Sequence, residues 1–283
     1  MGNPTIIVQA RVEASRLPGK TLIPILGQPL ILHLLDRLSQ TWLAIVCALP
    51  ATVESFPLRE CLERHGYHVE TPTVSGDDLL GRYAAVAKKV NADPIIRITG
   101  DCVLIDHQIV TKALIRYEQA LGSVSYVALA KEWPDGLDTE VFSRQALMDA
   151  DEYATLASDR EHVTPWMWKQ PERYRSSLLA CPFDLGTEKW SVDDMEDLTL
   201  VRRIYERLYP VYGRGFGWRD IYGLIMTEPK IKARLMQQPR NQGYMRQVAN
   251  EQGAATTETS WEQARYGVPD HGNDPRPDLS TER

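Results

Sequence analysis

An open α/β fold, with a largely parallel sheet flanked by helices, is predicted by three features of this sequence. Strand-like runs alternate with helix-like runs through most of the 283 residues. Several of the strand-like runs are apolar almost throughout, as strands buried on both faces are. The intervening runs repeat apolar residues at helical spacing. Alternation of this kind is typical of units with right-handed crossovers, so we expect helices packed against one sheet.

The expected strands are short and rich in aliphatic and β-branched residues. The first of them, TIIVQA, is followed directly by a cationic loop. In chain order we expect strands at residues 5–10, 43–48, 67–71, 94–99, 124–130, 138–142, 175–180 and 188–192.

The expected helices each carry one apolar face. Residues 29–40 place four leucines on one side, and residues 77–90 add acids in the first turn and lysines near the last, which suits the helix dipole. Residues 107–120 and 194–208 repeat the pattern. Ser158 followed by Glu161 resembles a capping box and predicts a helix that runs to about residue 168.

Composition excludes several classes of function. The content of 43% hydrophobic and 25% charged residues is that of a globular protein, and the net charge of −6 argues against nucleic-acid binding. No run approaches the roughly 18 apolar residues of a membrane span, so we expect no membrane insertion. The four cysteines are widely spaced, which favours reduced thiols in a cytoplasmic protein.

The last part of the chain differs in composition from the rest. Residues 250–283 are polar and hold few large apolar groups. We therefore expect one domain over residues 1–249 and a C-terminal tail over 250–283 that is either disordered or docked on a partner.

The loop after the first strand indicates an anion site. Residues 1–28 hold three cations, Arg11, Arg16 and Lys20, and one anion, Glu13, although the whole chain is acidic. Arg offers forked donors and Lys a mobile point charge, a combination suited to polyphosphate. The loop spans residues 11–28, which is long for a connection without a function.

Two further strand ends carry carboxylates. Asp101 follows the strand 94–99 and Asp193 follows the strand 188–192. Taken alone, Asp193 is more typical of a helix N-cap, and Asp101 is as consistent with a turn residue. Ligands of open α/β sheets bind beyond the carboxyl ends of strands, and magnesium prefers one or two carboxylates together with phosphate oxygens. Together with the cationic loop, these residues predict a magnesium–triphosphate site.

Several motifs, in order, resemble one family. QARVEASRLPGK, RITGDCVLID, WPDGLDTEVFS, SDREHVTPW, WSVDDMEDLTLV and RNQGYM occur between residues 5 and 248. The chain thereby resembles cytidylyltransferases of the spore-coat polysaccharide biosynthesis type, relatives of acylneuraminate and 3-deoxy-manno-octulosonate cytidylyltransferases. The resemblance implies a mixed, mostly parallel sheet of the nucleotide-diphospho-sugar transferase type. It also implies transfer of CMP from CTP to an acidic or phosphorylated acceptor, commonly a sugar, with release of pyrophosphate, and a homodimer.

The resemblance also implies roles for individual residues. It assigns triphosphate binding and catalysis to Arg11, Arg16 and Lys20, and magnesium to Asp101 and Asp193. The neighbouring Ala10, with Gly76 and Asp78, matches the nucleotide side. The acceptor side is matched by Asp135, Asp138, Glu140, Arg160 and His162, for which turn and cap roles remain the alternative.

The chain departs from its relatives in the loop itself. Glu13 and Ala14 stand where relatives carry glycine and serine, so a like charge enters a polyanion site. The cost of this charge is larger if the carboxylate points inward and small if it points away. We expect Glu13→Gly to tighten CTP binding, and a weakened affinity would show that Glu13 has acquired a role. The same departure leaves open a degenerate paralogue that binds nucleotide or a partner without turnover. Pyrophosphate release would separate the two. A dinucleotide-binding dehydrogenase is disfavoured because no GxGxxG follows the first strand.

Overall fold

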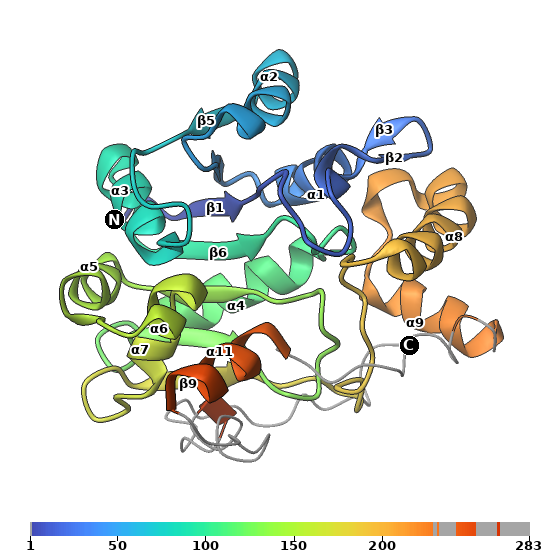
Figure 1. Ribbon diagram of the computed structural model, residues 1–283. Coiled ribbons are helices and arrows are strands. Elements are labelled where there is room, and N and C mark those ends of the chain that lie inside the picture. The colour runs from blue at the N-terminus through green and yellow to red at the C-terminus, as the bar shows by residue number, and fades with distance from the viewer. Residues whose placement is uncertain (1, 229–230, 232–241, 253–264, 267–283) are drawn as a thin grey trace.

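A seven-stranded sheet forms the centre of the molecule (Figure 1). The structure, a computed structural model, describes residues 2–228, 231, 242–252 and 265–266. The strand order is β5-β4-β1-β6-β8-β7-β9. The strands are β1 Thr5–Gln9, β4 Ala44–Ala48, β5 His68–Glu70, β6 Ile95–Thr99, β7 Tyr126–Leu129, β8 Glu140–Phe142 and β9 Ser176–Leu179.

The sheet is mixed and mostly parallel, which confirms the predicted fold class. β8 runs antiparallel to both of its neighbours, β6 and β7, and the other neighbouring pairs are parallel. In the register of the central strands, Ile7 lies opposite Val46 on one side and Arg97 on the other. The carboxyl ends of β1 and β6 therefore meet at one edge of the sheet (Figure 1).

Helices cover both faces because successive strand residues alternate between two apolar layers. Ile7, Ile95 and Phe142 share one layer with α3, α5 and α7. Ile6, Ile96 and their neighbours share the opposite layer with α1, α2 and α4. The bounds are α1 Leu30–Leu38, α2 Phe56–Arg64, α3 Leu79–Val90, α4 His107–Gln119, α5 Arg144–Tyr153, α6 Ala157–His162 and α7 Pro165–Trp168.

A third apolar cluster lies at the edge where β1 and β6 end. Here α8 (Met195–Tyr212) and α9 (Trp218–Thr227) pack against residues of the long connections, including Leu137 and Trp190. The helix α11 (Gln242–Gln252) lies over α6. None of the helices among the described residues is long and apolar enough to cross a membrane.

Two sequence predictions were wrong in detail. Residues 188–192 form no strand, because Lys189 makes only an isolated bridge to Asp135. The helix predicted over 158–168 is interrupted at Val163, whose φ is 72°, and divides into α6 and α7. Ser158 is not its cap, since its hydroxyl instead donates to Glu251 over 2.6 Å.

Other elements were not anticipated. The loop 11–28 contains a 3-10 helix, η1 (Lys20–Leu22), and a small hairpin, β2 (Pro24–Ile25) with β3 (Gln28–Pro29). α2, α5, α9 and α11 were also missed. α11 continues past the predicted domain boundary at residue 249, and Arg265 and Tyr266 contact the main body. The remainder of the predicted tail lies outside the described residues.

Arg37 of α1 joins three segments beside the sheet. Its side chain is buried, with 1% of the residue exposed. Nε donates to Ile105 O over 2.7 Å, and Nη2 donates to Phe216 O over 2.7 Å. The guanidinium also lies 3.9 Å from the centre of the Phe216 ring. Arg37 thus fixes the segment before α4 and the segment before α9 to α1 (Figure 1).

We expect Arg37→Met to lower the free energy of unfolding by roughly 3 kcal/mol, because buried carbonyls lose charged donors. Urea denaturation measures the change. The matched control is Arg59→Met on α2, where a half-exposed Arg59 pairs with Glu63; this substitution should change stability by less than about 0.5 kcal/mol. Equal stability of the two variants would contradict the role given to Arg37.

Candidate active site

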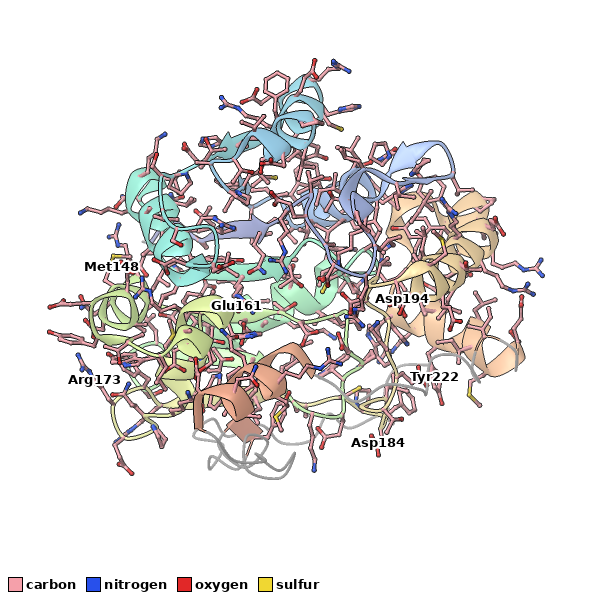
Figure 2. The ribbon with its side chains drawn as sticks, in the orientation of Figure 1. Met148, Glu161, Arg173, Asp184, Asp194 and Tyr222 are labelled. Carbon is pink, nitrogen blue, oxygen red and sulfur yellow. The ribbon has the colours of Figure 1, made fainter. Side chains whose placement is uncertain are left out.

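A cleft of about 380 Å³ opens at the sheet edge where β1 and β6 end. β8 runs in the opposite direction, so its amino end and the loop before it reach the same edge. Figure 2 shows Glu161 on α6 and Asp194 at the start of α8, on two sides of this region. The cleft is lined by Gln9, Ala10, Arg11, Ala14, Ser15, Arg16, Lys20, Thr21, Gly76, Asp77, Leu79, Arg82, Arg97, Thr99, Gly100, Asp101, Cys102, Asp135, Asp138, Glu161, His162, Lys189, Ser191, Asp193 and Arg265.

The floor of the cleft is the polar half of one sheet face. Along β6, Ile95 belongs to the apolar layer, while Arg97 and Thr99 on the same face line the cleft. Gln9 does the same at the end of β1. Arg97 is a cation inside an otherwise apolar strand, and the Glu140 carboxylate behind it offsets the cost of its burial, so the polar end of this face can serve as a binding surface.

Lys20 connects the cationic loop to both predicted metal ligands. Its Nζ lies 3.1 Å from Asp101 Oδ2 and 3.1 Å from Asp193 Oδ1, and donates to Val192 O over 2.7 Å. Burial disfavours the charged ammonium, but the two carboxylates outweigh this effect and raise the pKa of Lys20. The sequence prediction that these three residues come together is therefore correct in geometry.

Asp193 is not the helix cap that its position suggested. The N-cap of α8 is Asp194, which accepts from the backbone N–H groups of Glu196 and Asp197. Asp193 instead pairs with Lys20, with Arg16 at 3.0 Å and with Lys189 at 3.2 Å. Burial raises the pKa of Asp193, but Lys20 and Lys189 outweigh it and lower the value to about 2. The carboxylate is thus ionised at neutral pH.

A close backbone approach holds the acceptor-side loop against the Asp193 segment. Gly136 has a φ of 111°, and a Cβ there would lie 2.4 Å from Ser191 N. Asp135 N donates to Glu188 O over 3.0 Å, and Val192 N donates to Asp101 O over 3.1 Å. Only glycine fits at position 136, so the PDG turn is required to bring the two segments together.

Two arginines on the nucleotide side lack carboxylate partners. Among the described residues, neither Arg11 nor Arg82 has a carboxylate within 4.0 Å. The Arg82 Nη2 donates to Gly76 O over 2.8 Å, and its Nε has no partner. Burial and, after it, the nearby Arg11 lower the pKa of Arg82, although Tyr83 opposes the shift. Two adjacent guanidinium groups of this kind can bind phosphate.

Three of the predicted site residues do not line the cleft. Asp78 caps α3 by accepting from Gly81 N, and Arg160 binds it through two bonds of 2.9 and 2.8 Å. Arg160 also pairs with Asp151. Glu140 is 1% exposed and lies behind Arg97. The structure therefore gives these side chains positioning contacts, whereas Ala10, Gly76, Asp135, Asp138 and His162 line the cleft as predicted.

Unpaired buried polar atoms concentrate in this cleft. Within the described part of the chain, side-chain atoms that are buried and have no hydrogen-bond partner occur on five residues, all of which line it: Gln9, Arg82, Arg97, His162 and Arg265. Such atoms cost free energy unless a ligand or water satisfies them. The cleft is therefore built for a polar ligand.

Sequence reasoning missed several of these residues. Arg97 carried a usable signal, because it interrupts the apolar run PIIRIT. Lys189 and Arg82 gave no signal of their own, since cations are ordinary on loops and helices. Arg265 lies in a polar segment whose composition predicted no site.

Glu13 belongs to the cationic loop and does not line the cleft, although its charge acts on Arg82, which does. The side chain is exposed, and Thr52 Oγ1 is 3.5 Å from its carboxylate. Glu13 does not line the cleft, whereas Ala14 and Ser15 do. Of the two orientations that the sequence left open, the structure favours the outward one.

A cationic loop, the carboxylates of Asp101 and Asp193, and two arginines without carboxylate partners among the described residues lie at one edge of a mostly parallel sheet and define a nucleotidyltransferase type of site. Residues 5–202 match the cytidylyltransferase family, and the chain belongs to that family of CTP-dependent nucleotidyltransferases.

Two relatives match over most of their length. An uncharacterized protein of Methanocaldococcus jannaschii is 30% identical over 231 residues, 80% of this chain and 91% of the relative. The spore coat polysaccharide biosynthesis protein SpsF of Bacillus subtilis is 25% identical over 217 residues, 73% of this chain and 88% of the relative. The relatives also include 3-deoxy-manno-octulosonate cytidylyltransferases. Among solved structures, a cytidylyltransferase of Leptospira borgpetersenii has the same fold, with a TM-score of 0.78 and 24% identity, over 84% of this chain and 99% of that one.

The carboxylate pair fits magnesium better than a metal held by protein alone. Among the described residues, no group of three or more His, Cys, Asp or Glu side chains gathers as a metal cage. Asp101 and Asp193 offer oxygen ligands and lie close enough to share one cation, the Lys20 ammonium. Magnesium binds through one or two carboxylates when phosphate and water complete its shell. The donor set is therefore suited to magnesium that arrives with a nucleotide.

We expect Glu13→Gln, which removes only the charge, to change the dissociation constant of CTP by less than about twofold, because the carboxylate is exposed and screened. Calorimetric titration with CTP measures it. Arg16→Gln on the same loop is the comparison, and it should weaken binding by about fivefold or more. A clear tightening in Glu13→Gln would show instead that the carboxylate opposes the bound triphosphate.

Proposed function

We propose that this enzyme transfers CMP from CTP to an acidic sugar or related anionic acceptor in a magnesium-dependent reaction that releases pyrophosphate. The observation that carries the proposal is the position of Lys20 Nζ, 3.1 Å from both Asp101 and Asp193, beside the cationic loop. Membership of the cytidylyltransferase family supports CTP as the donor.

The cations of the cleft suit the leaving group. In nucleotidyl transfer, an acceptor oxygen attacks the α-phosphorus in line and pyrophosphate departs, so catalysis consists mainly of positioning and charge neutralisation. Arg11, Arg16 and Arg82 would bind the triphosphate and stabilise the charge that develops on pyrophosphate. No nucleophilic side chain is needed for this reaction.

Lys20 would change partners when the nucleotide binds. Its ammonium is held by two carboxylates in this structure. Asp101 and Asp193 would hold magnesium, which polarises the phosphate when bound. Lys20 would then donate to the triphosphate. Lys189 and Arg16 also lie close to Asp193 in this structure. Their charges would partly balance the Asp193 carboxylate while Lys20 moves away from it.

The acceptor would occupy the half of the cleft beneath α6. The carboxylates of Asp135 and Asp138 can accept hydrogen bonds from the hydroxyls of a sugar, and His162 offers an uncharged ring nitrogen. Burial and, next, Arg97 lower the pKa of His162 to about 4, so it carries no charge at neutral pH. Relatives that act in polysaccharide biosynthesis support a sugar as the acceptor.

A binding protein without turnover is the alternative that the substituted loop suggested. The exposed position of Glu13, outside the cleft, removes the main reason for that alternative. Ala14 replaces a hydroxyl donor but leaves the cations of the loop in the cleft.

We expect Asp101→Asn to reduce pyrophosphate release from CTP, magnesium and a panel of sugar acids by about 100-fold or more, because the magnesium site loses a charged ligand. A coupled pyrophosphate assay measures it. Asp101 is 29% exposed in its side chain, so the fold should persist, and the thermal midpoint checks this.

Asp194→Asn is the matched control. This variant also changes an aspartate to asparagine, at the position next to Asp193. It keeps the N-cap of α8, because asparagine caps a helix as well as aspartate does. Turnover of this variant should stay near that of the wild type. Near-normal turnover in Asp101→Asn would contradict the assignment of Asp101 as a magnesium ligand. If the wild type released no pyrophosphate with any acceptor, the alternative of a binding protein without turnover would be favoured.

A further inference from the structure

Arg265 reaches the cleft from beyond the region that matches the family, residues 5–202. Its Nη2 lies 3.2 Å from Glu140 Oε1, and its side chain is 12% exposed. The next residue, Tyr266, packs against the apolar layer that contains Tyr126 and Phe142. The C-terminal part of the chain therefore contributes a fixed cation to the half of the cleft assigned to the acceptor.

Arg265 and Arg97 share a single carboxylate. Arg97 Nη1 lies 2.5 Å from Glu140 Oε2, because the two residues are cross-strand neighbours in β6 and β8. Glu140 also accepts from the hydroxyls of Tyr126 and Thr164. Burial raises the pKa of Glu140, but Arg97 and Arg265 outweigh it and lower the value, so Glu140 is an anion. Two guanidinium groups thus share the carboxylate of Glu140.

The same group of residues holds unpaired donors. Nε of Arg97, Nε of Arg265 and Nε2 of His162 are buried and have no hydrogen-bond partner within the part of the chain that the structure describes. The three side chains all line the cleft. They also influence one another, since Arg97 and Arg265 both lower the pKa of His162.

We propose that Arg265, Arg97 and His162 form the binding site for a carboxylate of the acceptor, with Arg265 as a specificity-determining residue. This inference rests on the proposed function and names the chemical group that the acceptor half recognises. Glu140 holds the two guanidinium groups from behind and does not itself contact the acceptor.

Charge favours a carboxylate over a phosphate at this site. A carboxylate adds one negative charge beside the two guanidinium groups that share Glu140. A phosphate monoester carries nearly two at neutral pH, and Asp138 lies close enough to Arg265 to raise its pKa. A dianion would therefore leave uncompensated negative charge in a buried site, which is unfavourable.

The test is binding of 3-deoxy-manno-octulosonate by calorimetry, with CTP present and divalent cations removed so that no turnover occurs. The wild type should bind the acid and bind its neutral methyl ester at least about tenfold more weakly. Arg265→Gln should bind the acid about tenfold more weakly than the wild type, because a charge-assisted donor is lost, and bind CTP unchanged. Arg265→Lys should recover part of the affinity.

The exposed Arg59→Gln is the control and should bind as the wild type does. The inference is overturned if Arg265→Gln binds the acid as tightly as the wild type, if acid and ester bind equally, if neither binds, or if glucose 1-phosphate binds with stronger dependence on Arg265. The binding experiment measures no turnover, so the two proposals can fail separately. If binding of the acid depends on Arg265 but the complete reaction releases no pyrophosphate, only the proposed function is overturned. Release that is indifferent to Arg265 would overturn this inference alone.

Discussion

The contact of Lys20 with Asp101 and Asp193 is the interaction on which the site depends. It joins the loop after β1, the end of β6 and the segment before α8, which are distant in sequence. Without Lys20, the segments that carry Asp101 and Asp193 would present two like charges close together. Each carboxylate has a cationic partner that offsets the cost of its partial burial, and that cation can be exchanged for another.

The arrangement of charges follows from the sheet. On one face, apolar residues give way to Gln9, Arg97 and Thr99 as the strands approach their carboxyl ends. The single antiparallel strand, β8, then brings Glu140 beside Arg97 and the loop with Asp135 and Asp138 to the same edge. The proposed nucleotide and acceptor halves thus lie on opposite sides of β6, and the acceptor half combines the cations Arg97 and Arg265 with the carboxylates of Asp135, Asp138 and Glu140.

The sequence was sufficient for the sheet and for much of the nucleotide side. Apolar runs such as TIIVQ and PIIRIT are buried strands because their burial decides their conformation, and the ends of β1 and β6 bring Arg16, Lys20 and Asp101 to one edge. Asp193 joins them from a connection that was wrongly predicted to be a strand. Local patterns failed where long-range contacts decide. Glu140, Arg160 and Asp78 carry the right charges but are used to hold neighbouring elements. Val163 breaks a helix that capping chemistry alone predicts as continuous, and Arg265 comes from a segment without periodicity.

A crystal structure with CTP and magnesium tests the central claim most directly. The account predicts magnesium between Asp101 and Asp193, with the Lys20 ammonium moved from the carboxylates to the triphosphate, and with Arg11, Arg16 and Arg82 on phosphate oxygens. A structure in which Lys20 keeps both carboxylates while the triphosphate binds elsewhere would contradict it.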